Sequence, residues 1–119
     1  MDRITRLRRG DIRFGWEVNY YGIGELAKRA GEIRIGSPLD PATEMGPLAT
    51  LRQRQRAQHL IAESIAAGAV LMAGGGVPKG FGTGFYFEPT ILLAPRADLP
   101  CVQHEFFGPV LSVMAFDTE

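Results

Sequence analysis

The feature that most constrains the fold is the stretch 100–116, in which a polar loop leads into an apolar run. After a Phe-Gly-Pro corner at 107–109, residues 110–116 include a single polar side chain, Ser112. Apolar residues at successive positions face both sides of a strand, a pattern typical of strands buried between two layers. A short buried helix gives a similar pattern, and the β-branched and aromatic residues of the run favour the strand. We therefore predict a loop followed by a buried strand.

A single carboxylate, Glu105, lies just before this corner. A carboxylate beside an aromatic ring at the end of a buried strand is a candidate ligand-binding group, because open α/β sheets bind ligands in the loops at strand ends. On residue types alone, a solvated loop glutamate beside a core phenylalanine is the more common arrangement. Both interpretations stay open at this point.

The chain has 119 residues, enough for one domain with its own core and too few for the two-domain architecture of most cofactor-dependent enzymes. Its formal net charge is zero, and no apolar run approaches the roughly 18 residues of a membrane-spanning helix. Neither nucleic acid nor a membrane is therefore expected as a partner. The one cysteine, Cys101, excludes an internal disulfide and suits a reducing cytoplasm. His59 has no second ligand at a suitable spacing, so no metal site is predicted.

The first thirteen residues are basic, with five arginines against two aspartates. Such a segment is more often a frayed, solvated terminus than a nucleic-acid-binding arm or a transit peptide. No apolar segment of a secretion signal follows it, so secretion is not expected. Aromatic and apolar residues at the even positions of 13–21 indicate a strand there, and residues 1–21 receive no domain assignment.

The remainder of the chain predicts helices and short strands. The clearest helix is 50–67, with Thr50 as its N-cap and Gly68 as its C-terminal glycine. Pro89 inside an expected strand at 85–93 indicates an edge strand or a bulge. The other predicted elements are a helix at 25–32, an ordered loop at 36–48, a buried strand at 69–73 and a glycine-rich hairpin at 74–84. We therefore predict an α/β fold with helices packed on a mostly parallel sheet.

Residues 22–27 match a dinucleotide-binding fingerprint, with Gly22, Gly24 and Ala27 as its small residues and Asp40 at about the expected distance. Glycines in such a loop let a pyrophosphate approach a helix N-terminus. Against this interpretation, the next candidate strand, 32–35, is very short and leads into Gly36 and a proline, which places Asp40 in a turn. A chance match is the preferred explanation.

Three motifs, in this order, resemble the aldehyde dehydrogenase superfamily over residues 25–119. The first is Ile-Arg-Ile-Gly-Ser-Pro-Leu-Asp-Pro-Ala-Thr-Glu-Met-Gly-Pro-Leu at 33–48. The second is Gly-Gly at 74–75 followed by Phe-Tyr-Phe-Glu-Pro-Thr-Ile-Leu at 85–92. The third is Glu-Phe-Phe-Gly-Pro-Val at 105–110. The resemblance implies that residues 22–119 form part of a catalytic domain of this superfamily.

The resemblance also implies a chemistry that this chain lacks the residues to perform. Members of the superfamily oxidise aldehydes with NAD or NADP, using a cysteine thiolate as nucleophile and a glutamate that activates water. The Asn-x-Gly-Gln-x-Cys-like and Glu-Leu-Gly-Gly-like segments that carry these groups are expected upstream of Glu25, and neither occurs. Cys101 lies in a loop where the superfamily does not place its nucleophile. No catalytic residue is predicted, and the Rossmann cofactor domain is missing.

Two residues are expected to contact the cofactor by resemblance. Glu105 matches the glutamate that binds the nicotinamide ribose, and Phe107 matches the aromatic residue that helps to place the nicotinamide. Two departures from the superfamily pattern, His104 in place of an acid and Ser37 in place of Asp or Asn, bear on the detailed cofactor preference. NAD or NADP is the expected cofactor of the full-length family, and binding by this chain alone is not expected.

Three functional interpretations follow. The first is a fragment or truncated form of an NAD(P)-dependent aldehyde dehydrogenase, inactive alone, whose exposed strands drive self-association. The second is a non-catalytic structural or interaction module that pairs with another chain completing the sheet. The third is a small nucleotide-binding protein that uses Gly22, Gly24 and Ala27.

Overall fold

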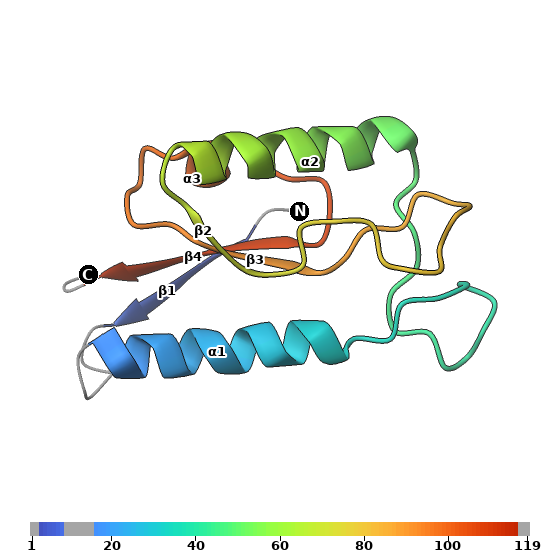
Figure 1. The fold of residues 1–119 in the computed structure, drawn as a ribbon, viewed down its shortest axis with the longest axis horizontal. Coiled ribbons are helices and arrows are strands. Elements are labelled where there is room, and N and C mark those ends of the chain that lie inside the picture. The colour runs from blue at the N-terminus through green and yellow to red at the C-terminus, as the bar shows by residue number, and fades with distance from the viewer. Residues whose placement is uncertain (1–2, 9–15, 117–119) are drawn as a thin grey trace.

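The computed structural model describes residues 3–8 and 16–116, and its elements form three layers (Figure 1). In chain order they are β1 (Arg3–Arg8), α1 (Trp16–Glu32), α2 (Leu51–Ala66), β2 (Val70–Ala73), β3 (Thr90–Leu93), α3 (Pro100–Gln103) and β4 (Val110–Phe116). The strands form one sheet in the order β1-β4-β3-β2, with α2 on one face and α1 on the other. Within the described ranges, no helix is long and apolar enough to cross a bilayer.

The sheet is mixed, with two of its three strand pairs parallel. β4 lies between β1 and β3 and is parallel to both, and Thr90 of β3 is aligned with Val110 of β4. β2 is antiparallel to β3 and lies at the edge, with a register shift between Leu71 and Ala73. The predicted α/β fold with a mostly parallel sheet is confirmed.

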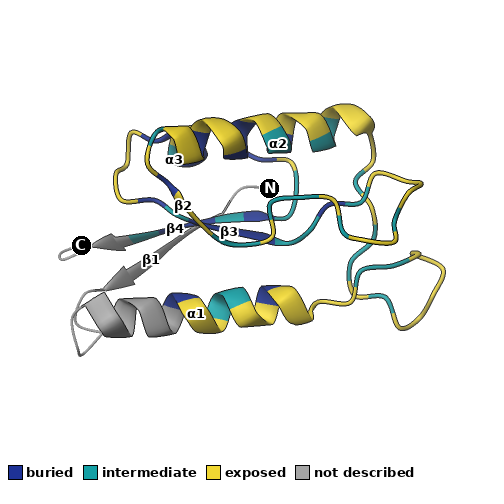
Figure 2. Cartoon of the chain, viewed as in Figure 1, coloured by how far each residue is buried: buried dark blue, intermediate teal, exposed yellow. Residues whose placement is uncertain are grey.

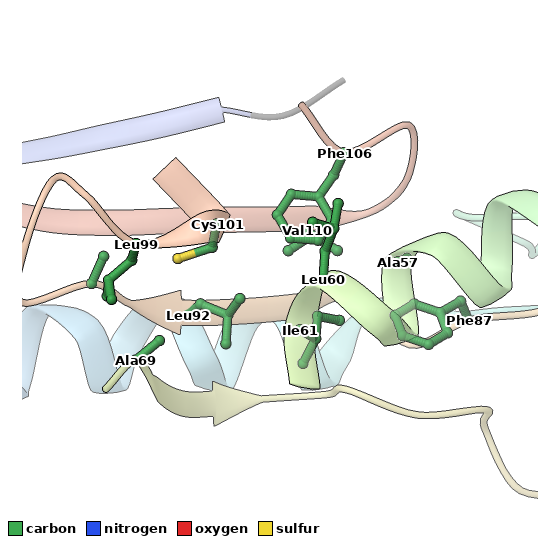
Figure 3. Close-up of a cluster of buried hydrophobic side chains, with 11 residues drawn as sticks. Ala57, Leu60, Ile61, Ala69, Phe87, Leu92, Leu99, Cys101, Phe106 and Val110 are labelled. Atoms are coloured by element: carbon green, nitrogen blue, oxygen red, sulfur yellow. The ribbon is translucent and has the colours of Figure 1, made fainter. Parts of the chain in front are cut away.

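β4 is buried on both faces, as its apolar run predicts. Val110 belongs to a cluster beneath α2, and Val113 belongs to a second cluster beneath α1. Figure 3 shows the first cluster, which consists of Ala57, Leu60, Ile61, Ala69, Phe87, Leu92, Ala94, Leu99, Cys101, Phe106 and Val110. β3 and the first part of β4 are buried or half-buried between the helices, while the outward face of α2 is exposed (Figure 2).

Helix α2 forms where the sequence predicts it, to within one residue at each end. The side chain of Thr50 accepts a hydrogen bond from the backbone N–H of Gln53 at 3.1 Å, which satisfies one of the free donors of the first turn. Gly68 follows the helix with φ of +119°, a conformation that favours glycine. The buried face of α2 consists of Ala57, Leu60, Ile61 and Ser64.

The N-terminal predictions were wrong in two respects. The segment 16–21, predicted as a strand, belongs to helix α1, which also extends the predicted helix at 25–32; positions 13–15 lie outside the described residues. Residues 3–8, interpreted as part of a frayed terminus, form β1 alongside β4. Buried Ile23 and Ala30 pack α1 against the sheet, and such packing outweighs the roughly 1 kcal/mol that each interior glycine costs a helix.

Strands form within both predicted segments, 69–73 and 85–93, but the predicted burial of the first and the predicted extent and edge position of the second were wrong. β2 is not buried. It lies at the edge of the sheet with a strand partner on one side only, and its Val70 and Leu71 are 44% and 41% exposed. The segment 85–89 is not a strand, and Pro89 directly precedes β3. β3 is an interior strand that tolerates this proline because pairing begins only at Thr90.

Residues 74–76, called the glycine turn because Gly74 and Gly75 have positive φ, follow β2 directly and lie beside residues 88–90. Gly74 has φ of +69°, and a Cβ at this position would overlap the carbonyl oxygen of Pro89 and lie 2.8 Å from Oγ1 of Thr90. At Gly82, in contrast, a Cβ would project into open space, and the backbone angle is not left-handed. The turn therefore needs glycine at 74 and not at 82.

We expect Gly74→Ala to lower the free energy of unfolding by about 1–3 kcal/mol from backbone strain alone. Gly82→Ala, the matched control, should change it by less than about 1 kcal/mol. Urea denaturation of the two variants and the parent chain measures both values. Equal effects of the two substitutions would contradict the close approach of the turn to Pro89.

Candidate functional site

The two candidate cofactor-contact residues lie in the loop between α3 and β4. The short helix α3 begins with Pro100 and ends at Gln103, where the backbone N–H of His104 donates to the carbonyl of Pro100 at 3.0 Å. The side-chain amide of Gln103 donates to the carbonyl of Ala97 at 2.6 Å. These bonds fix the start of the loop. The loop lies at the amino end of β4, whereas the general rule for open α/β sheets places ligands at the carboxyl ends.

Burial alternates along the loop. The side chain of Phe106 is 1% exposed and inserts into the cluster beneath α2 (Figure 3). Its neighbours Glu105 and Phe107 are both exposed, Phe107 by 57%. Burying a phenylalanine contributes on the order of 2–3 kcal/mol, enough to anchor a short loop. Phe106 is therefore the anchor, and the two candidate residues are displayed on either side of it.

A second anchor joins α3 to β4. The hydroxyl of Ser112 donates to the backbone carbonyl of Cys101 at 2.8 Å, and both residues are buried. This bond explains why the one polar residue of β4 is tolerated in the core, because a buried hydroxyl without a partner costs free energy. The thiol of Cys101 is part of the same core and is 0% exposed, so it has no access to a soluble aldehyde.

The Phe-Gly-Pro corner is fastened to the neighbouring elements. The backbone N–H of Thr90 donates to the carbonyl of Pro109 at 2.8 Å, and that of Val110 donates to the carbonyl of Gly108 at 2.8 Å. A Cβ at Gly108 would lie 3.6 Å from a methyl group of Leu48, so the loop before α2 also packs on the corner. The end of the site loop is therefore held as firmly as its start.

An apolar groove of about 440 Å³ lies on the α1 side of this corner. Its lining includes Leu26 and Ala30 of α1 together with Thr90, Gly108 and Pro109. Neither Glu105 nor Phe107 lines it. The groove and the candidate cofactor contacts are therefore separate features of the surface.

The Glu105 carboxylate is available to an external donor. Among the described side chains, those of residues 23–114, it takes part in none of the hydrogen bonds or ion pairs. An ionised carboxylate is an acceptor with two oxygens, which suits a pair of sugar hydroxyls. An exposed aromatic ring two residues away offers an apolar face beside it. The arrangement can bind a sugar and an adjoining ring, but it contains no nucleophile.

The other candidate nucleotide-binding residues are not in a suitable geometry. Gly22, Gly24 and Ala27 lie inside α1, so they do not form the strand-to-helix turn that the fingerprint requires. Asp40 lies in a turn, as expected, where its carboxylate accepts from the N–H of Ala42 at 2.9 Å. Across residues 3–8 and 16–116, no group of three or more His, Cys, Asp or Glu side chains is placed to hold a metal ion.

Sequence reasoning missed the residue that joins the corner to the glycine turn, Thr90. This residue is 1% exposed and bonds to both features. A hydroxyl residue directly after Glu-Pro, opposite a run of three glycines, was the available signal. A β-branched hydroxyl residue is also common in strands, so the pattern alone does not distinguish a ladder residue from a hydrogen-bonding hub.

Comparisons with known proteins agree with the motifs of the sequence. The sequence model of the Aldehyde dehydrogenase family matches residues 22–119. Betaine aldehyde dehydrogenases from Brucella anthropi and Brucella ovis are 46% and 44% identical to this chain over 99 residues. These alignments cover 82% of this chain and 20% of each relative. The chain thus spans about a fifth of the length of the curated relatives it matches.

Solved structures show the same similarity at the level of the fold. The NAD+ complex of aldehyde dehydrogenase from Bacillus cereus matches with a TM-score of 0.83 and 29% identity, over 97% of this chain and 22% of that chain. Betaine aldehyde dehydrogenase from Staphylococcus aureus in complex with NAD+ matches with a TM-score of 0.84 and 28% identity, with the same coverage. The structural match covers more of the chain than residues 22–119, although the assignment of residues 1–21 stays a prediction.

We expect the adjacent phenylalanines of the loop to respond in opposite ways to truncation. Phe106→Ala removes the anchor and should lower the free energy of unfolding by about 3–5 kcal/mol. Phe107→Ala, the matched control, removes an exposed ring and should change it by no more than about 0.5 kcal/mol. Chemical denaturation followed by circular dichroism measures both. A larger loss for Phe107→Ala would mean that the loop is turned the other way.

Proposed function

Because the chain belongs to the aldehyde dehydrogenase family, we propose that it forms the part of an NAD(P)-dependent aldehyde dehydrogenase catalytic domain that contacts the nicotinamide ribose. The observation that supports this proposal is the alternating burial of the site loop. Phe106 is held in the core while Glu105 and Phe107 are presented to solvent on a backbone that is fixed at both ends. A rigidly held pair of this kind loses little conformational entropy when a ligand binds.

Each residue has a distinct role in this proposal. The Glu105 carboxylate accepts hydrogen bonds from ribose hydroxyls, and bonds to an ionised acceptor are stronger than neutral ones. The ring of Phe107 packs beside the nicotinamide and limits its orientation. The dinucleotide supplies the chemistry of hydride acceptance when it is bound. NAD is the first cofactor to test, since solved relatives of this chain contain NAD+, and NADP is the second.

The chain alone is proposed to be inactive toward aldehydes. A thiolate nucleophile needs solvent access and an activating environment, and the buried Cys101 has no such access. One carboxylate and one ring exceed the roughly 4–15 kcal/mol that association of a dinucleotide costs by only a small margin, so binding by this chain alone is expected to be too weak for calorimetry. We propose a cytoplasmic location, which suits a protein with a free thiol and no disulfide partner for it.

We expect neither binding heat nor turnover when the purified chain is titrated with NAD or NADP and assayed with an aldehyde in the same sample. Turnover would mean that Cys101 becomes accessible and acts as a nucleophile. The contact residues are tested separately by nuclear magnetic resonance at about 10 mM NAD, a concentration that detects contacts worth only about 3–4 kcal/mol.

In that titration the amides of residues 104–108 should shift. Glu105→Gln should abolish the shift, because the amide retains one acceptor oxygen but no charge. Glu32→Gln, an exposed carboxylate near the end of α1, should leave it unchanged. Shifts confined to residues 22–27 would instead support the nucleotide-binding interpretation. A response at 104–108 that survives Glu105→Gln would contradict the proposed ribose contact.

We further propose that the chain associates with itself, or with another chain that completes its sheet, through the β2 edge. β2 pairs with β3 on one side only, so its other side presents backbone groups without a strand partner within the described sheet. Val70 and Leu71, at 44% and 41% exposure, place apolar side chains on the same strand. An exposed apolar edge of this kind is a template for strand pairing.

Self-association should therefore be weakened by a charge on this edge. We expect Val70→Lys or Leu71→Lys to shift the chain from oligomer to monomer in analytical ultracentrifugation. Val77→Lys is the matched control, because Val77 is 40% exposed but lies outside the strands. An oligomer that persists in both edge variants would exclude β2 as the contact. If the parent chain is itself monomeric, self-association is wrong, and pairing with a different chain is the proposal that stands.

A further inference from the structure

Thr90 is the point at which three segments of the chain are joined. The residue is 1% exposed and begins β3. Its Oγ1 accepts from the backbone N–H of Gly75 at 2.9 Å and donates to the carbonyl of Glu88 at 2.9 Å. Its own backbone N–H donates to the carbonyl of Pro109 at 2.8 Å. A single residue therefore links the glycine turn, the start of β3 and the corner that ends the site loop.

The glycine turn forms a strap over the start of β3. Besides the bond from Gly75, the N–H of Gly76 donates to Oε1 of Glu88 at 3.2 Å, and the N–H of Glu88 donates to the carbonyl of Gly76 at 2.9 Å. Gly74 leaves no room for a side chain against Pro89. The strap thus restrains residues 88–90 from one side, while the corner is bonded to Thr90 from the other.

We propose that Thr90 is a positioning residue, which uses its hydroxyl to hold the strap and its N–H to hold the corner, and so fixes Glu105 and Phe107 in the orientation that meets the cofactor. The inference rests on the proposed function. Thr90 does not touch the cofactor in this scheme. It acts through Pro109, whose carbonyl it binds, and through the pairing of β3 with β4, in which it is aligned with Val110.

The chemistry of the hydroxyl explains why threonine is suited to this position. A hydroxyl donates one hydrogen bond and accepts another at the same time, and both are used here. Valine has nearly the same shape but leaves the N–H of Gly75 and the carbonyl of Glu88 without this partner in a part-buried place. Unpaired polar groups there favour a strap that opens toward water. Serine keeps the hydroxyl and loses only a methyl group.

A residue that only contributes to stability would give a different result. Its loss would increase global unfolding, and the exchange of every protected amide would accelerate by the same factor. The loop carrying Glu105 and Phe107 would keep its native geometry. A positioning residue changes the loop in the folded state, before any unfolding occurs.

The experiment compares Thr90→Val, Thr90→Ser and the parent chain by nuclear magnetic resonance. Thr83→Val, an exposed threonine of the glycine-rich loop, is the control. The amide of Leu92 lies deeper in β3, and its hydrogen exchange reports global unfolding. Thr90→Val should accelerate the exchange of the amides of Gly75 and of position 90 by at least about tenfold more than that of Leu92. It should also shift the amides of Glu105 and Phe107. Thr90→Ser and Thr83→Val should retain the parent values.

Uniform acceleration with unchanged amides at Glu105 and Phe107 would overturn the positioning role. If Thr90→Val does not fold, Thr90→Ala is measured with the same readouts, because alanine also lacks the hydroxyl and places no methyl group against the two groups that lose it. In that variant the exchange difference between Gly75 and Leu92 and the amide shifts of Glu105 and Phe107 should both be seen. Their absence would also overturn the proposal.

Titration with about 10 mM NAD separates this inference from the proposed function, because contacts worth about 3 kcal/mol are detectable there. The response at Phe107 should fall in Thr90→Val and recover in Thr90→Ser. A response abolished by Glu105→Gln but unchanged by Thr90→Val would retain the cofactor contact and overturn the positioning role. If instead Thr90→Val displaces the loop while Glu105→Gln leaves the NAD response unchanged, Thr90 would still be the residue that positions the loop. The proposed contact between the loop and the cofactor would then be wrong.

Discussion

Burial of β4 on both faces is the constraint on which the other elements depend. A strand with apolar residues on each side needs a covering layer on each side, and α1 and α2 supply these layers. Because β4 is parallel to both neighbours, the chain has to return to the other end of the sheet before it enters β4. Neither strand can therefore be joined to β4 by a tight hairpin. Only β2, added antiparallel at one edge, departs from this parallel arrangement.

The site loop is held rigidly because it is anchored in this core. Phe106 is buried in the cluster that also packs α2 on the sheet, so displacing the loop would open the core. Ser112 and Thr90 add hydrogen bonds from β4 and β3 to the two ends of the same loop. The residues that are displayed, Glu105 and Phe107, contribute little to this packing. The residue that packs in the core and the residues that are exposed to a ligand are thus neighbours in one short motif.

Local chemistry decided which elements could be predicted from the sequence. Helix α2 has a capping threonine, a periodic apolar face and a terminal glycine, and β4 has an apolar run too dense for a surface element. The strand β1 and the first half of α1 have no such signals, since three arginines occupy β1 and two glycines interrupt the first half of α1. Likewise, nothing in the residues of β2 tells an edge strand from a buried one. The resemblance identified Glu105 and Phe107 as candidates, but their display depends on the direction of Phe106, which residue types alone do not give.

Holding a cofactor contact in place and performing catalysis are separable demands on a polypeptide, and we propose that this chain meets only the first. Display requires a fixed backbone, which α2, β3 and β4 provide through contacts within residues 16–116. Catalysis requires an accessible nucleophile, and Cys101 lies in the same core that makes the backbone rigid. Affinity requires contacts along the whole dinucleotide, because each must be set against the entropy of association. The curated relatives are about five times longer than the part this chain matches, and we propose that the remaining contacts and the chemistry come from segments of that kind.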